Sequence, residues 1–340
     1  MLKNAARELV VRSRALSAFR AGAAAVDGFL KRTALLPRAQ RGGLVFMFHG
    51  VAEDPSPYRF DVSRAAFEAF CDVVADGYDV LPLAELEDRR RAGSLPARAV
   101  AITFDDGYAN NHDVAWPVLR RHGLPATVFV TTSAVGGERP LWFHRVAHIF
   151  ETTRPEALPV TVGPWTFTLD TDSERVSTVG RISAELKKMP AARREEMIAA
   201  LGEAFGVTDF SSLAREMLTW DQLRAMDAGG FTAEAHTVSH PILGAETLEA
   251  AAREIGESRE ILSAALKRPV DLFAYPNGKS EDMTDGVVRA VEHAGFRAAF
   301  TAEFAAARTS DDPYKIPRVT AYADTKGALR LQIERSFYAR

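Results

Sequence analysis

The sequence predicts an α/β fold in which short, mostly parallel strands form a layer or barrel between helices. Two observations lead to this prediction. The chain of 340 residues is 47% hydrophobic and carries a net charge of −3, which is typical of a globular protein with a sizeable core. From residue 43 onward, short apolar runs alternate with helical stretches, and this alternation is typical of parallel α/β folds.

The predicted elements follow in chain order. Apolar runs predict strands at 44–48, 99–104, 126–130, 231–235, 271–275 and 298–301, with a closing strand region just before Arg318. Helices are predicted at 64–76, 112–122, 247–266 and 283–294, each with Gly or Pro close to its end. Residues 137–217 fit this alternation less well, because a strand-like run at 165–168 precedes helix-like runs between 173 and 205. We therefore predict a mainly helical insertion at about 137–217, over one end of the core.

Composition and charge exclude several classes of protein. The single cysteine, Cys71, rules out an internal disulfide framework and a cysteine-rich zinc site. A metal ion would therefore have to be held by histidine and carboxylate side chains. With a pI near 6.3, the chain lacks the basic excess that binding to nucleic acid requires, and we expect no such partner. The sequence leaves the oligomeric state open.

The first 41 residues differ from the rest, since they hold nine basic and two acidic side chains and so a net charge of +7. Apolar residues recur there at the spacing of one helical face: Leu2, Leu9, Leu16, Phe19, Ala23, Val26 and Leu30. We predict a basic amphipathic helical arm at 1–41, ahead of a body at 42–340. Two interpretations stay open, a helix docked on its own domain and a helix lying on anionic lipid.

The sequence shows no signal-peptide pattern, because the best apolar stretch, 21–26, is broken by Asp27 and Lys31. It also has no run approaching the roughly 20 apolar residues that span a bilayer. We expect a cytoplasmic protein that makes peripheral contact with the inner face of an anionic membrane through residues 1–41.

Two neighbouring carboxylates come directly after the predicted strand 99–104. Asp105 and Asp106 come directly after the apolar run 101–104 and precede Gly107. Parallel α/β folds carry their sites at this edge of the sheet. A cation bound by one carboxylate would leave the other free to act as a base. The alternative is a plain turn, because Asp and Gly favour turns.

Two histidines follow another predicted strand. The run 231–235 leads directly into His236 and His240, whose imidazoles converge if the backbone between them makes a helical turn. Imidazole is the commonest protein ligand for zinc and related ions. The histidine pair alone is a weak signal, but together with Asp105 and Asp106 it predicts a metal site with positions left for water and substrate.

These two motifs resemble those of the polysaccharide deacetylase family, also called the NodB-homology or carbohydrate esterase family 4 domain. The resemblance rests on 103–107 and 236–240 and extends over about residues 43–322. It implies a distorted (β/α) barrel of seven strands and a divalent metal, most often Zn²⁺, with Co²⁺, Ni²⁺ or Mn²⁺ as alternatives. By position, Asp105 resembles the general base of the family. Asp106, His236 and His240 resemble its metal ligands.

The chain departs from the family pattern at two points. Ala274 stands where the third motif usually has an arginine, and Arg318 is our candidate to replace it. The acid histidine that the family carries late in the chain has no good match here. His49 ends the first predicted strand, as in a rearranged subset of the family whose acid histidine lies near the N-terminus, and we predict that it is the acid.

Five further residues are candidates for binding substrate. Trp220 and Asp221 could wall the site or hold His49, although Thr219 or Asp221 capping a helix at 222–227 explains them as well. Trp142 could stack on a sugar, or could pack within the insertion. Tyr275 and Asn277 lie on a strand-end loop, where their backbone could line an acetyl pocket.

The implied activity is hydrolysis of N-acetyl groups on amino sugars of a polysaccharide, an oligosaccharide or a lipid-linked saccharide of the cell envelope. In the implied mechanism, Asp105 takes a proton from water and His49 protonates the leaving amine. The backbone N–H of Tyr275, or that of a neighbouring residue, is a candidate oxyanion donor. Two alternatives stay open, a hydrolase of another acyl amide such as an N-formyl sugar and a non-catalytic carbohydrate-binding relative. The latter predicts loss of the Asp and His motifs, which are present.

Overall fold

Seven parallel strands form the centre of the described chain. The computed structural model describes residues 42–152, 159–169, 171–321, 323 and 325–339. The strands are β1 (Leu44–Phe48), β5 (Ala99–Phe104), β6 (Ala126–Val130), β9 (Phe231–Ala235), β10 (Leu272–Ala274), β11 (Ala298–Phe304) and β12 (Ile316–Arg318), paired in this order. Backbone hydrogen bonds that Val319 makes with Val45 and Met47 join the last strand to the first. The predicted distorted barrel is confirmed, and four of its strands have the predicted bounds.

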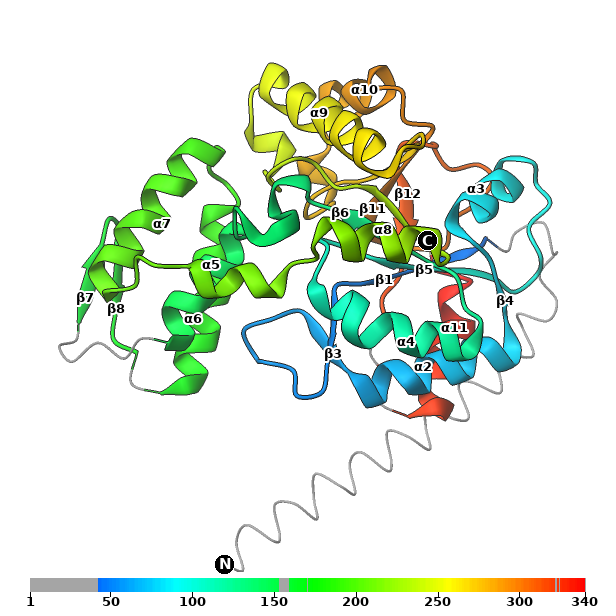
Figure 1. Cartoon of the computed structure of the whole chain (residues 1–340), viewed down its shortest axis with the longest axis horizontal. Coiled ribbons are helices and arrows are strands. Elements are labelled where there is room, and N and C mark those ends of the chain that lie inside the picture. The colour runs from blue at the N-terminus through cyan, green and yellow to red at the C-terminus, as the bar shows by residue number, and fades with distance from the viewer. Residues whose placement is uncertain (1–41, 153–158, 170, 322, 324, 340) are drawn as a thin grey trace, which may run out of the picture. The chain divides into compact units, whose positions relative to one another are not determined.

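Helices cover the outside of this barrel (Figure 1). They are α2 (Arg64–Gly77), α3 (Leu83–Arg91), α4 (Trp116–His122), α8 (Trp220–Ala228), α9 (Leu248–Leu266), α10 (Asp285–His293) and α11 (Lys326–Ser336). Short elements complete this part of the chain: β2 (Gly50–Ala52), β3 (Asp61–Ser63), β4 (Asp79–Val80), η3 (Thr132–Gly137), η5 (Leu243–Ala245) and η6 (Ser280–Asp282). The helix predicted at 112–122 instead begins as a π-helical segment, η2 (Asn111–Ala115). The buried Asn111 side chain there donates to the carbonyl of His49.

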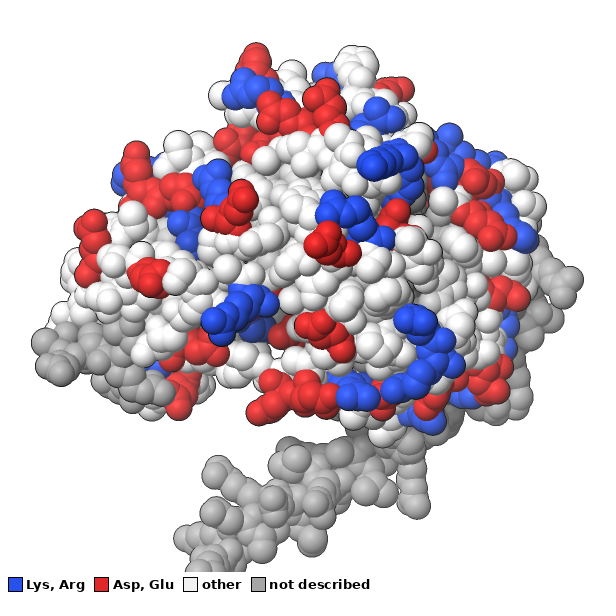
Figure 2. Space-filling model, in the orientation of Figure 1, with Lys and Arg blue, Asp and Glu red and all other residues white. Residues whose placement is uncertain are grey.

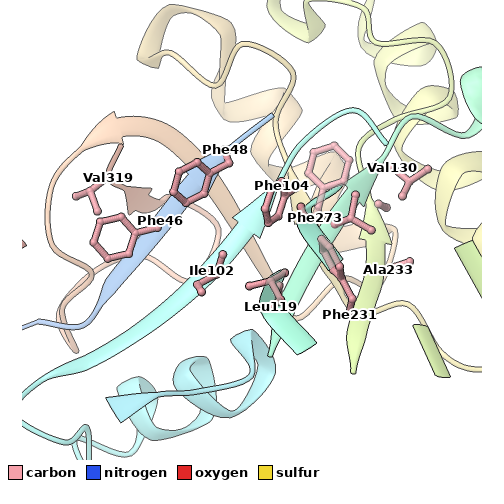
Figure 3. Close-up of a cluster of buried hydrophobic side chains, with 14 of the residues drawn as sticks. Phe46, Phe48, Ile102, Phe104, Leu119, Val130, Phe231, Ala233, Phe273 and Val319 are labelled. Atoms are coloured by element: carbon pink, nitrogen blue, oxygen red, sulfur yellow. The ribbon is translucent and has the colours of Figure 1, made fainter. Parts of the chain in front are cut away.

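Phenylalanines fill the layer between the strands and the helices (Figure 3). Phe48 and Phe104 lie on neighbouring strands with ring centroids 5.5 Å apart, and Phe104 contacts Phe231 at 5.2 Å. Residues that alternate with these along the strands form a separate cluster, in which the rings of Phe129 and Phe300 lie 5.6 Å apart. Both faces of the central strands are thus apolar, as expected for parallel strands covered by helices. The polar side chains Asp105, Asp106 and His236 lie just past the ends of β5 and β9.

The segment predicted as an insertion has a small core of its own. It comprises α5 (Trp142–Thr152), a hairpin of β7 (Val160–Val162) and β8 (Trp165–Phe167), α6 (Asp172–Leu186), α7 (Ala191–Phe205) and η4 (Ser211–Glu216). Phe150, Phe167 and Phe205 meet at its centre, with centroid distances of 5.1–5.6 Å. These elements lie beside the barrel, at the left of Figure 1.

The surface shown in Figure 2 carries acidic and basic side chains intermixed over the helices. Among the described residues, no helix is both long enough and apolar enough to cross a bilayer. The predicted basic arm at 1–41 lies outside the described residues.

Candidate metal and catalytic site

The two adjacent carboxylates at the end of β5 point to different partners. Asp105 continues the strand, since its backbone N–H donates to the carbonyl of Phe48. Asp106 has a φ of 75°, in the left-handed region that is uncommon for residues other than glycine. Such a backbone conformation costs free energy, and it occurs preferentially at functional sites. This change of direction separates the surroundings of the two side chains.

Asp105 is held by Arg318, which ends β12. The guanidinium donates from Nη1 to Oδ1 at 2.7 Å and from Nη2 to Oδ2 at 2.8 Å, while Nε donates to the Thr301 carbonyl. Both side chains are buried. Burial alone would raise the pKa of Asp105, but Arg318 outweighs it and holds that pKa below its ordinary value. Asp105 is thus a fixed, ionised carboxylate, and Arg318 occupies the position that we predicted for a substitute arginine.

Asp106 faces His236 and His240. Its Oδ1 atom lies 3.5 Å from Nε2 of His236 and 3.3 Å from Nε2 of His240, and all three side chains are buried. Burial opposes ionisation, but the two imidazoles hold the pKa of Asp106 well below its usual range. The ligand atoms of the three residues lie within 4.8 Å of one another.

The hydrogen bonding of this group fits a cation. Nδ1 of His236 donates to the carbonyl of Ala274 at 2.7 Å, so in the neutral imidazole Nε2 is left to accept, and it faces a carboxylate oxygen that also accepts. Oδ1 of Asp106 is buried and makes no hydrogen bond. One carboxylate and two imidazoles suit Zn²⁺ and related first-row ions. The predicted ligands therefore come together in an arrangement suited to a divalent metal.

The loop that carries the two histidines is fixed from several sides. Thr237 and His240 both have positive φ values, 67° and 58°, and Thr237 accepts a hydrogen bond from the backbone N–H of His240. Glu254 of α9 accepts from the backbone N–H groups of Val238 and Ser239 and from the Ser239 hydroxyl, at 2.6–2.8 Å. These bonds stabilise a strained turn. Its positive φ values cost free energy, above all at a β-branched residue such as Thr237.

Tyr108 binds the carboxylate oxygen of Asp106 that does not face the histidines. Its hydroxyl donates to Oδ2 of Asp106 at 2.9 Å, and Nε2 of the buried His144 lies 2.9 Å from the same hydroxyl. Burial and the neighbouring Asp106 raise the pKa of Tyr108 well above its ordinary value, so the hydroxyl stays protonated and keeps donating. Oδ2 is thereby occupied, and Oδ1 is left for the cation. Sequence reasoning did not identify Tyr108, although its position two residues after Asp106 was a usable signal.

One cavity of about 210 Å³ contains this group. Its lining includes the residues predicted as catalytic or metal-binding: His49, Asp105, Asp106, His236, His240 and Arg318. Asn277 also lines it, as predicted, through a loop at the end of β10. Phe60 lies at this cavity with its side chain 65% exposed and its ring 5.5 Å from that of His49. We did not predict Phe60, because nothing in its local sequence distinguishes it from a packing residue.

Two predicted residues lie elsewhere. Trp220 and Asp221 do not line the cavity: Trp220 packs against the hydrophobic core, and the Asp221 side chain is 94% exposed and pairs with Arg224. Thr219 caps α8 by accepting from the backbone N–H of Gln222, so the capping interpretation was the right one.

The roles suggested for two aromatic residues also need correction. Trp142 reaches the cavity but is only 3% exposed, because Arg194 covers its ring and its Nε1 donates to the carbonyl of His240. It therefore supports the histidine loop and offers little face to a sugar. Tyr275 lines the cavity, but its backbone N–H donates to Phe300 across the sheet and is not free to bind an oxyanion.

The sequence is similar to one family of known proteins. The family model described as "Polysaccharide deacetylase" matches residues 92–299, more than half of the chain. The Bacillus subtilis (strain 168) protein YxkH, whose name refers to polysaccharide deacetylases, is 21% identical over 286 residues, which cover 84% of this chain and 73% of that protein. Poly-beta-1,6-N-acetyl-D-glucosamine N-deacetylase of Staphylococcus aureus (strain MSSA476) is 30% identical over 109 residues, which cover 32% of this chain and 36% of that protein.

A solved structure resembles the fold. The deacetylase PplD of Streptococcus pyogenes, in complex with acetate, superposes with a TM-score of 0.57 at 18% sequence identity, and the match covers 86% of this chain and 97% of that one.

Proposed function

Because the chain belongs to the polysaccharide deacetylase family, we propose that it hydrolyses N-acetyl groups on amino sugars of a saccharide, with a divalent metal. The observation that carries this proposal is the shared cavity, in which the ion-paired Asp105 lies beside the group formed by Asp106, His236 and His240. The name of the Staphylococcus aureus relative supports N-acetylglucosamine as the sugar.

Asp106, His236 and His240 would hold the metal, which when bound supplies a Lewis acid that polarises the amide carbonyl and acidifies a water molecule. Tyr108 occupies the second oxygen of Asp106 and Ala274 fixes the ring of His236, so two of the three proposed ligands are oriented before a metal arrives. Such orientation reduces the free energy spent on ordering the site.

Asp105 acts as the general base in this proposal. It is ionised and held in one orientation by the two hydrogen bonds from Arg318, and it therefore accepts a proton from the attacking water. Arg318 acts through Asp105 and is a positioning residue. Because the guanidinium binds both oxygens of Asp105, the two adjacent carboxylates have different partners and can have different roles.

His49 acts as the general acid. An amine leaves poorly until it is protonated, and the His49 imidazole lines the same cavity as Asp105 and the metal-binding group. In its protonated form it donates a proton to the nitrogen of the scissile amide. Phe60, exposed beside His49, offers an aromatic face on which a sugar ring can stack.

Mass spectrometry of N-acetylglucosamine oligomers incubated with zinc-loaded protein tests the proposal. We expect loss of acetyl groups and matching release of acetate. The Asp105→Asn and His240→Ala variants serve as controls and are expected to release little acetate. Intact oligomers with the wild-type protein, together with turnover of an N-formyl sugar, would instead favour a different acyl amide as the substrate.

A further inference from the structure

A lysine from the insertion reaches into the cavity. Lys187 directly follows α6, and its Nζ atom donates to Oδ1 of Asn277 on the barrel at 2.6 Å. Both side chains line the cavity that contains the metal-binding group. Lys187 therefore links the insertion to the barrel at the place where substrate would bind.

No carboxylate among the described residues contacts the ammonium group of Lys187. Burial lowers the pKa of Lys187, because the half-buried ammonium has lost part of its hydration. Among the described residues it forms no ion pair, and its hydrogen-bond acceptor is the neutral amide of Asn277. That amide is itself fixed, since Nδ2 of Asn277 donates to Asp282 at 2.5 Å and the backbone φ of Asn277 is 61°.

The carboxylates of the cavity are already engaged. Asp105 is neutralised by Arg318, and Asp106 faces the two imidazoles. Asp282 accepts from Asn277 and from the backbone of Lys279 but forms no ion pair with Lys187. Asp282 attracts the Lys187 ammonium from a distance but does not contact it. A partly desolvated cation with no carboxylate in contact favours a ligand that brings a negative charge, because the ligand then offsets the cost of desolvation.

The neighbouring lysine shows the contrast. Lys188 is 69% exposed and pairs with Glu185 at 2.7 Å, as expected for a surface lysine on a helix end. Lys187 instead turns toward the cavity. The two residues therefore provide a matched pair for experiment.

Building on the proposed deacetylase function, we propose that Lys187 recognises an anionic group of the substrate. The substrate class is then an N-acetylated saccharide that carries a carboxylate or a phosphate on the sugar being deacetylated or on its neighbour. A lysine ammonium is a compact charge with three rotatable donors, so it can accept either group. A neutral hydroxyl would occupy one donor but would leave the charge uncompensated.

The test compares three oligosaccharides of equal length: a neutral N-acetylglucosamine oligomer, one containing a uronic acid and one carrying a phosphate. For each, kcat/KM is measured with the wild-type protein and with Lys187→Met, Lys187→Arg and Lys188→Met. We expect the wild type to prefer one anionic oligomer by roughly tenfold or more, a typical effect of a hydrogen bond to a charged group. Lys187→Met should lose this preference, and the other two variants should keep it. Comparing the uronic acid with the phosphate identifies the anion.

Calorimetric titration of the same oligomers separates this inference from the proposed function. If no oligomer is deacetylated, the proposed function fails, while the dissociation constants still decide the role of Lys187. Equal losses on neutral and anionic oligomers in Lys187→Met would overturn the inference. So would a wild-type protein that binds and turns over the neutral oligomer best.

Discussion

The residues of the cavity owe their different properties to their partners. Asp105 and Asp106 are adjacent and chemically identical, yet one is bound by a guanidinium and the other by a tyrosine hydroxyl opposite two imidazoles. The positive φ of Asp106 makes this possible, because it turns the second carboxylate away from the first. This difference in partners is the reason we propose one carboxylate for proton transfer and the other for metal binding.

Tyr108 provides a test of this assignment that does not depend on activity. Tyr108→Phe removes the hydrogen bond to Oδ2 of Asp106 and leaves the ring in place. We expect zinc affinity to fall by roughly 10- to 100-fold, the usual effect of losing a partner of a metal ligand. Competition with a chromophoric chelator measures it. Tyr78→Phe is the control, because Tyr78 donates to Glu334 away from the cavity; an equal loss in both variants would contradict the assignment.

His49 provides a second test at this scale. If His49 donates a proton to the leaving amine, activity requires its protonated form and declines as pH rises. We expect His49→Ala to lower kcat by roughly two orders of magnitude or more and to abolish the alkaline limb of the pH–rate profile. His293→Ala, which alters an exposed histidine on α10, should change neither. A normal alkaline limb in His49→Ala would mean that another group is the acid.

At the scale of elements, α9 does more than cover the barrel. Its Glu254 holds the turn between the two histidine ligands through three hydrogen bonds. The cost of the positive φ values at Thr237 and His240 is offset by this contact with a neighbouring helix. The position of the two candidate histidine ligands therefore depends on a residue that lies 14 positions after His240 in the sequence.

Glu254→Ala should loosen this turn. We expect zinc affinity and kcat/KM to fall together, by roughly 10-fold or more, with a smaller loss of thermal stability. Glu257→Ala is the matched control, because Glu257 is exposed on the same helix. Metal titration and steady-state kinetics on both variants check this. If Glu254→Ala binds zinc as tightly as Glu257→Ala, the turn is held by other contacts.

The alternation of short apolar runs with helical stretches was sufficient to predict an α/β layer or barrel, and the resemblance to the polysaccharide deacetylase family specified the distorted barrel of seven strands. Asp105, Asp106, His236 and His240 could be predicted because Asp105 and His236 directly follow such runs, and the second member of each pair lies one or four positions later. Glu254 and Lys187 could not, since their partners lie on other elements and no local pattern reports such contacts. Tyr108 was missed although it lies only two residues after its partner Asp106. Trp220 and Asp221 were misassigned because residue type alone does not distinguish a residue at the start of a helix from one that binds substrate.

At the scale of the whole molecule, charge is unevenly distributed along the chain. Residues 1–41 carry a net charge of +7, whereas the whole chain has −3. The sequence therefore keeps open a peripheral interaction of the first 41 residues with anionic lipid. Each basic residue near such a surface contributes about 1 kcal/mol, so several together suffice for reversible binding.

Co-sedimentation with vesicles tests this interaction. We expect the full chain to pellet with anionic vesicles at low salt and to be released as salt increases, because screening weakens exposed charges. A chain that begins at Gly42 should stay in the supernatant. If both chains stay in the supernatant, the first 41 residues do not bind lipid.

The division of labour between the two carboxylates is the central claim, and the metal content of two variants tests it most directly. Asp105→Asn and Asp106→Asn are each purified, loaded with zinc and analysed for metal-to-protein ratio and turnover. Asp105→Asn is expected to retain the metal of the wild type while its turnover falls by roughly two to four orders of magnitude, the contribution of a positioned base. Asp106→Asn is expected to lose both metal and activity. Loss of metal in Asp105→Asn, or turnover near that of the wild type in that variant, would contradict the claim.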